Sequence, residues 1–272
     1  MRGPLLLLTH SLKRVRGLIG VMGVLLAAFQ VVLILVAGSI QNSGGFEQLM
    51  ALQPPFVREL MGPAFTSVMS FAGIVCVGYF HVVVMGALVA LSIALGTMPT
   101  SEIETGFIDL ILARPLARHW IITRTIIVAV IASAGILALM QAGTWTGLYT
   151  LAPPRAAWPA RHLMLSLVLN LGLLMLCWSG VAMAIGSAAR RRGVAGAMAG
   201  FLALAMFLLD YVGRMWHPAE RVAWLSPFRY YTPFDLVMGD PLPGKNVVVL
   251  CGIAVAGSVV AYVLFSRRDI SH

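Results

Sequence analysis

The side chains best suited to chemistry lie in one short charged run, residues 101–118, between two long apolar stretches. Its charged residues, in chain order, are Glu102, Glu104, Asp109, Arg114 and Arg118. Carboxylates near the start of a helix and basic groups near its end complement the helix dipole, so this order favours a helix. Such a helix can form ion pairs and hydrogen bonds with a partner molecule. From the residues alone, the run is either a docking element or an interfacial linker whose charges contact only headgroups and water. We predict no catalytic residue in the chain.

The same run carries signals for where its helix begins and ends. Ser101 and Glu104 fit the capping box S/T-x-x-E, in which two side chains satisfy backbone donors at a helix start. Four apolar residues recur at helical spacing and form one stripe: Ile103, Phe107, Leu110 and Ile111. Pro115 disfavours helical geometry at Arg114, so the helix should stop or bend there. The run is therefore predicted to form a short amphipathic helix that lies along a membrane face.

The elements on either side of this run are long and apolar. Of 272 residues, 60% are hydrophobic and 11% are charged, whereas soluble domains are roughly half apolar and about a quarter charged. A helix needs about 20 apolar residues to cross the hydrocarbon core. Six stretches meet this length: about 17–40, 63–97, 120–149, 163–188, 194–213 and 246–266. Because they are continuous rather than alternating, we predict an all-α integral membrane protein, with residues 1–272 as a single transmembrane domain.

Basic residues are distributed unevenly between the two sets of span ends. One set has the larger share: Arg2, Lys13, Arg14, Arg16, Arg114, Arg118, Arg124, Arg190, Arg191, Arg192, Arg267 and Arg268. By the positive-inside rule these ends face the cytoplasm, together with both termini and residues 101–118. The net charge of +9 is thereby assigned to the membrane surface, and nucleic acid is not expected as a partner. Residues Pro4–Arg16 are predicted to form an amphipathic helix on that surface, and a plain basic flank is the alternative.

Few polar groups lie inside the predicted spans. His81, Gln141 and Asn170 either line a pathway through the membrane or hold helices together, and the sequence does not choose between these roles. For His81 we favour a hydrogen bond from a neutral ring to a neighbouring helix. Asp210 and Arg214 are spaced i,i+4 and are expected to form a structural ion pair. Spans without a chain of acidic residues do not suit a proton-driven carrier.

The segment between the last two predicted spans, Arg214–Gly244, is rich in aromatic residues. Its rings are Trp216, Trp224, Phe228, Tyr230, Tyr231 and Phe234. Amphipathic aromatic rings concentrate at the boundary between membrane and water. The segment is therefore predicted to lie in the outer interface or to dip into it.

Three short motifs resemble those of the ABC type-2 exporter permeases. The first is Glu-x-Glu-x-Gly-x-x-x-x-x-Leu-x-x-Pro-x-x-Arg, from Glu102 to Arg118. The others are Leu-Ser-Pro-Phe-x-Tyr-Tyr-x-Pro, from Leu225 to Pro233, and Phe-x-Arg-Arg-Asp, which begins at Phe265. In that family the first motif includes a coupling helix that docks into a groove on the ATP-binding subunit. The resemblance implies that seven residues contact an ATPase subunit: Glu102, Glu104, Gly106, Asp109, Arg114, Pro115 and Arg118.

The resemblance extends over the whole chain in length, number of spans and topology. It implies the membrane-spanning permease of an ATP-driven exporter in the bacterial cytoplasmic membrane. No Walker A motif is present, since Gly244-Lys245-Asn246 lacks both the spacing and the Ser/Thr. A separate ATPase must then bind ATP and Mg, and no cofactor is expected in this chain. Two ATPase copies and a second permease copy, the same chain or a different one, complete the implied assembly, and the transported substrate is left open.

Two other classes of function remain as alternatives. An integral-membrane enzyme or haem-binding electron carrier would need clustered histidines or acids at membrane depth. The other histidines are instead at span ends, in loops or at the terminus: His10, His119, His162, His217 and His272. The three cysteines lie within spans without metal-ligand spacing, so no metal site is predicted: Cys76, Cys177 and Cys251. A non-transporting membrane assembly or sensory factor would use the charged run without moving a substrate.

Overall fold

The computed structural model describes residues 2–45, 68–106, 119–154 and 156–267 of the chain. All regular structure in these ranges is helical, and six helices are long and apolar enough to cross a membrane. They are α1 (Arg2–Asn42), the interrupted pair α4 (Phe71–Phe80) and α5 (Val82–Gly96), α8 (His119–Leu151), α9 (Arg161–Ala188), α10 (Arg192–Gly213) and α13 (Gly244–Arg267). Each predicted stretch overlaps one of them. The prediction of an all-helical protein with six helices of spanning length is therefore confirmed.

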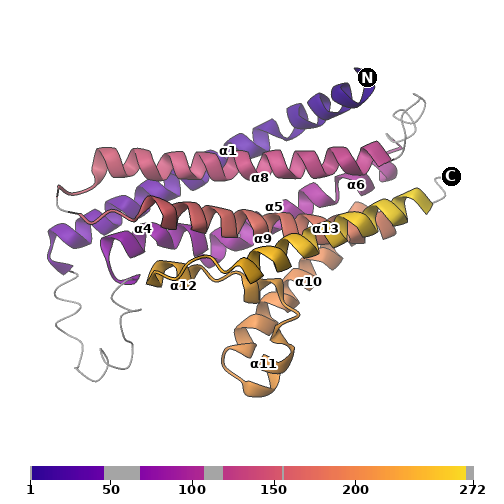
Figure 1. Cartoon of the computed structure of the whole chain (residues 1–272). Coiled ribbons are helices and arrows are strands. Elements are labelled where there is room, and N and C mark those ends of the chain that lie inside the picture. The colour runs from indigo at the N-terminus through magenta and orange to yellow at the C-terminus, as the bar shows by residue number, and fades with distance from the viewer. Residues whose placement is uncertain (1, 46–67, 107–118, 155, 268–272) are drawn as a thin grey trace.

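The first helix is much longer than a membrane span. α1 has 41 residues and is about 60 Å long, about twice the thickness of the hydrocarbon core. Pro4–Arg16 is helical as expected, but no break separates it from the following apolar residues, so it forms the start of α1 and is not an element of its own. Pro4 lies in the first turn, where proline is tolerated, and no second proline follows it within α1. The N-terminal turns of α1 diverge from α8 and project from the bundle (Figure 1).

The bundle is built around two close helix pairs. α1 packs along α8, and α13 packs along α9. A Cβ added at Gly143 of α8 would lie 2.5 Å from the Cα of Ala27 in α1. A Cβ added at Gly180 of α9 would lie 2.5 Å from the backbone oxygen of Ala254 in α13. Glycine at these two positions therefore allows the backbones to approach, which is how helices associate where water does not drive them together.

The aromatic segment after α10 folds back against the bundle. It contains α11 (His217–Ala223), the short 3-10 helix η1 (Pro227–Tyr230) and α12 (Pro233–Met238). Phe228 and Tyr231 are both buried. The ring of Phe228 packs on Trp178 of α9, with 5.6 Å between the ring centroids. The segment thus reaches inward among the long helices.

The two ends of the bundle differ in what they carry. A short helix, α6 (Met98–Glu104), follows α5 directly. The start of α1 and the end of α13 lie at the same end of the bundle as α6 (Figure 1). We call this the α6 end. The predicted docking run begins here, and the aromatic segment lies toward the other end.

Candidate functional site

The site begins where α5 ends. Thr97 closes α5 by donating from its Oγ1 to the backbone oxygen of Ile93 (2.9 Å), and α6 begins at the next residue. Pro99 lies in the first turn of α6, where a proline has no helical hydrogen bond to lose. Ser101 therefore lies inside α6, and the prediction that it caps a helix start is wrong.

α6 ends soon after the charged run begins. Gly106 has a left-handed backbone (φ 67°), and its N–H donates to the backbone oxygen of Ile103 (3.1 Å). Glycine accepts this conformation at a helix end more readily than other residues. The predicted single helix with a stripe from Ile103 to Ile111 is therefore interrupted at Gly106. Residues 107–118 lie outside the described part of the chain, and with them four predicted site residues: Asp109, Arg114, Pro115 and Arg118.

Three side chains of α6 bond to three different long helices. Thr100 donates from Oγ1 to a backbone oxygen of α9 (2.9 Å). The Glu102 carboxylate accepts from a guanidinium nitrogen of Arg124 on α8 (2.6 Å). The Glu104 carboxylate accepts from the backbone N–H of Arg192, the first residue of α10 (2.9 Å). We call these three bonds the α6 clamp, because through them one short helix holds α8, α9 and α10 together.

The ion pair between Glu102 and Arg124 is the buried centre of the clamp. Each of the two side chains is only 4% exposed. Ile103, next to Glu102, packs against a hydrophobic cluster that includes Ile122 of α8, so the charges are held in apolar surroundings. A charge there needs its partner, and removing one member of such a pair costs about 3–5 kcal/mol. The pair therefore fixes α6 to α8, and the carboxylate of Glu102, a predicted docking residue, is turned toward α8.

Close packing supports the clamp where α9 passes α6. The backbone oxygen that accepts from Thr100 belongs to Gly186. A Cβ added at Gly186 would lie 2.7 Å from the Oγ1 of Thr100. One added at Gly96, the last residue of α5, would lie 2.5 Å from the backbone oxygen of Ser179. Both glycines therefore let α9 lie directly against the junction of α5 and α6.

Glu104 forms the exposed part of the clamp. Its side chain is at the surface, and its bond goes to an N–H at the start of α10 that has no partner within that helix. Negative charge beside a helix start is also favoured by the helix dipole. The guanidinium group of Arg192 donates to the backbone oxygen of Ala94 in α5 (3.3 Å). The start of α10 is thereby held to both α5 and α6.

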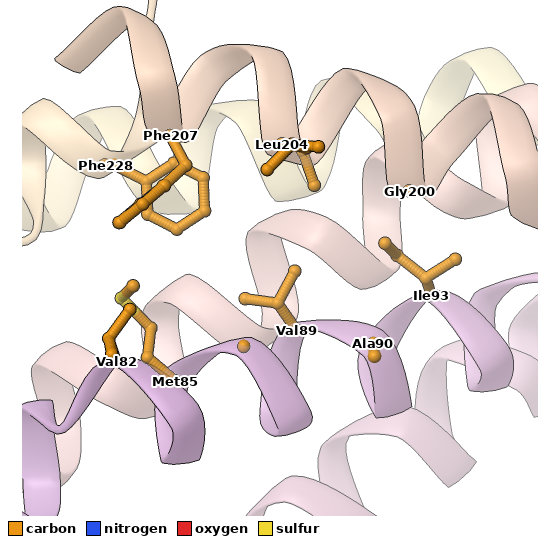
Figure 2. Close-up of a pocket in the computed structure, with 11 residues that line it drawn as sticks. Val82, Met85, Val89, Ala90, Ile93, Gly200, Leu204, Phe207 and Phe228 are labelled. Atoms are coloured by element: carbon orange, nitrogen blue, oxygen red, sulfur yellow. The ribbon is translucent and has the colours of Figure 1, made fainter. Parts of the chain in front are cut away.

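A groove runs between α5 and α10. Figure 2 shows side chains of α5 and α10 facing each other across a cavity of about 280 Å³. Its lining includes Val82, Met85, Val89, Ile93, Gly200, Leu204, Phe207 and Phe228. A second cavity, of about 470 Å³, shares Val82, Met85, Phe207 and Phe228 with the first. We call the two together the α5–α10 groove. Cavities of about 300–1,000 Å³ with mostly apolar linings are typical of small-molecule sites.

His81 lies in this groove, at the break between α4 and α5. Its Nδ1 accepts from the backbone N–H of Val83 (3.3 Å), and its ring meets Phe29 edge-on at 5.6 Å. In a continuous helix that N–H would bond to the backbone oxygen of Tyr79. Tyr79 instead accepts from the hydroxyl of Tyr231 (2.7 Å), so side chains satisfy both halves of the missing bond. Where a bond from His81 to a neighbouring helix was expected, its ring instead accepts from the backbone N–H of Val83, two residues along the chain.

The other two polar residues predicted within the spans differ from each other. Gln141 accepts from the hydroxyl of Tyr79 (2.5 Å), which also bonds to Thr144 (2.8 Å). Gln141 therefore helps to hold α4 against α8. Asn170 is completely buried on α9, and within the described part of the chain its amide has no hydrogen-bond partner. Neither residue lines the α5–α10 groove.

The predicted ion pair between Asp210 and Arg214 lies at the larger cavity of the groove. Arg214 donates from Nε to the Asp210 carboxylate (3.0 Å), which confirms the expected i,i+4 pair. Arg229 approaches the same carboxylate at 4.0 Å. Asp210, Arg214 and His81 all line the larger cavity. The groove thus has an apolar part toward the α6 end and a part with ionisable groups at the opposite end.

Several residues of the site were not anticipated from the sequence, chiefly Arg124, Arg192 and Tyr231. The strongest overlooked signal was Arg124, a charge inside a predicted span, because such a charge normally has a buried partner. Arg192 and Tyr231 gave no comparable signal, since their hydrogen-bond partners lie on helices that are far away in the chain. Among the described residues, no group of three or more His, Cys, Asp or Glu is placed to hold a metal ion.

Comparison with known proteins does not name a family for the chain. No protein-family model matches it, and no curated protein matches it either. Its function is therefore inferred from the α6 clamp, the groove and the sequence motifs.

Proposed function

We propose that the chain is the membrane-spanning permease subunit of an ATP-binding-cassette transporter, an exporter driven by ATP hydrolysis in separate ATPase subunits. The observation that carries this proposal is the α6 clamp. One helix between the second and third spans is bonded to α8, α9 and α10, and it continues directly from α5. A force applied to such a helix reaches four of the six spans at once. That is the property required of a coupling element.

The clamp also explains how a force at α6 would reach a pathway. α5 and α10 are the two walls of the groove, and both are held at the α6 end through Glu104, Arg192 and Ala94. A displacement of α6 therefore acts on both walls at once. The apolar lining suits a hydrophobic or amphipathic substrate, which enters from the cytoplasm or from the membrane. The groove is the proposed part of the transport pathway in this chain.

The proposed contact with the ATPase combines residues inside and outside the described ranges. Glu104 and Gly106 lie at the accessible end of α6, and Asp109, Arg114, Pro115 and Arg118 follow in the same run. Glu102 acts as a positioning residue, because its carboxylate is buried against Arg124. ATP and Mg are bound by two ATPase copies. A second permease copy, identical or related, completes the assembly in the lipid bilayer.

The orientation of the proposal rests on charge. Arg14, Arg124 and Arg192 all belong to the α6 end, and the positive-inside rule assigns that end to the cytoplasm of a bacterial inner membrane. Both termini are then cytoplasmic. A non-transporting assembly or sensory factor would have the same orientation and docking run, but it would have no use for a substrate groove. Transport through the groove therefore separates the two functions.

Charge reversal at Glu104 tests the coupling role. The chain is purified together with the ATPase that binds it, and ATP hydrolysis is measured with and without the permease. Glu104→Lys should leave the membrane subunit inserted and reduce its stimulation of hydrolysis at least tenfold, because both the surface charge and the bond to α10 are lost. Glu220→Lys is the matched control, since Glu220 is an exposed glutamate of α11, far along the chain from the run. Absence of any co-purifying ATPase, or equal activity of both variants and wild type, would contradict the proposal.

A further inference from the structure

A separate small cavity lies at the α6 end, on the side of α1. It has a volume of about 170 Å³ and is enclosed by residues of α1, α5, α6 and α10. We call it the basic pocket. Its polar lining consists of Arg14, Ser101 and Arg192. Its apolar lining is Val15, Leu18, Ala94, Leu95 and Met98. No part of the α6 clamp other than Arg192 lines this pocket, so its chemistry needs an explanation of its own.

The charge of the pocket has one sign. Its two charged lining residues are both arginines, and neither guanidinium group forms an ion pair with any described carboxylate. The nearest acid in the bonding network, Glu104, is engaged with the backbone N–H of Arg192 rather than with its side chain. Arg192 uses one side-chain nitrogen on a backbone oxygen, which leaves further N–H donors. Two arginines and a hydroxyl group suit an oxyanion with several acceptor oxygens, above all a phosphate.

The position of the pocket decides which phosphate it suits. α5 ends at Gly96, α10 begins at Arg192, and Arg14 comes just before the first predicted span, so the arginines lie where the apolar spans end. A soluble phosphate would leave the aliphatic side of the pocket uncovered. A phospholipid would cover it, because its acyl chain would run along Val15 and Leu18 with its head at the arginines. Basic pockets between spans at the cytoplasmic side are known to suit anionic lipid heads.

We propose that the basic pocket binds the phosphate head of an anionic phospholipid, held by Arg14 of α1 and Arg192 of α10. The lipid then bridges two helices that are far apart in the chain. It does so directly beside the bond between Glu104 and Arg192, and it steadies the start of α10. Anionic lipid in the inner leaflet would thereby support the α6 clamp.

Lipid titration of the purified full-length chain tests this proposal. Native mass spectrometry compares phosphatidylglycerol with phosphatidylcholine of identical acyl chains. Wild type should retain one phosphatidylglycerol at least tenfold more tightly than phosphatidylcholine. Arg14→Gln and Arg192→Gln should each weaken phosphatidylglycerol binding roughly fivefold and leave phosphatidylcholine unchanged. Arg14→Lys should restore most of the affinity, which a general folding defect would not allow.

Arg16→Gln provides the matched control. Arg16 is an exposed arginine of the same helix, two positions beyond Arg14, and it does not line the pocket. Its substitution should not change the tight site. The proposal is overturned if both lipids bind equally to wild type, if Arg16→Gln has the same effect as Arg14→Gln, or if millimolar inorganic phosphate displaces the lipid completely. Because the chain is tested alone, the result does not depend on an ATPase partner.

Discussion

The two ends of α5 are held in opposite ways. At one end, α6 is fixed by polar bonds, of which the pair between Glu102 and Arg124 is almost fully buried. At the other end, His81 interrupts the helix beside Asp210 and Arg214, and between the two ends a mostly apolar groove separates α5 from α10. Directional bonds in a low dielectric fix one geometry, whereas facing apolar surfaces tolerate a change of separation. The protein is therefore held in one geometry where its partner is proposed to dock, and the distance between α5 and α10 can change where a substrate is proposed to pass.

Removing one charge of the buried pair should have the largest effect. Arg124→Leu leaves Glu102 buried without its partner, so the free energy of unfolding should fall by about 3–5 kcal/mol. Unfolding of the purified protein in denaturing detergent measures it. The double variant Glu102→Leu with Arg124→Leu should recover most of the loss, because no unpaired charge then remains. Equal instability of the single and double variants would show that packing, rather than the ion pair, holds α6.

Adding one methyl group should have a smaller effect on stability, and its sign should differ between the α6 end and the groove. Gly186→Ala places a Cβ 2.7 Å from Thr100 and should lower stability by about 1–3 kcal/mol. Gly200→Ala, in the groove, meets nothing within 4 Å, and alanine favours a helix by about 1 kcal/mol over glycine. It should be neutral or stabilising in the same unfolding measurement. Similar losses for both would remove the distinction between a packed end and an open end.

Of these substitutions, filling the groove should change the free energy of unfolding least, but it should strongly reduce transport. Gly200→Leu extends a side chain into the smaller cavity, yet its effect on unfolding should stay within about 0.5 kcal/mol, because the space is open. Transport by the reconstituted complex should fall at least tenfold. Gly196→Leu is the control, since Gly196 lies one turn away on α10, is equally uncrowded and does not line the groove. Equal transport by the two variants would show that substrate passes elsewhere.

Most of the fold was predictable because the membrane imposes it. Long continuous apolar runs have few structural options, and the six spans were found from length and composition alone. The errors came from local backbone signals in the same apolar chain. Pro99 lies in the first turn of α6, so the capping pattern of Ser101 and Glu104 falls inside a helix that has already begun. Gly106 ended a helix that an apolar stripe had extended past it.

Much less of the site was predictable. The charged run drew attention to Glu102 and Glu104, but the sequence does not say which carboxylate turns inward. That choice depends on Arg124, which lies more than one helix turn into α8, and on the way α8 returns beside α6. The groove could not be inferred either, because most of its lining residues are ordinary apolar residues whose pairing depends on how α10 tilts from α5. His81 was recognised as unusual, whereas its role at a helix break depends on Tyr231, 150 positions later.

The break at His81 also gives α5 a hinge. The 15 residues of α5 form an arm of about 22 Å, and α6 is carried at its far end. A rotation of roughly 10° about His81 would move that end by about 4 Å, while α4 on the other side of the break need not follow. No proline or glycine occupies position 81, so the joint depends on the imidazole of His81 and the hydroxyl of Tyr231. Burial raises the pKa of Tyr231, so its hydroxyl keeps the proton that this joint requires.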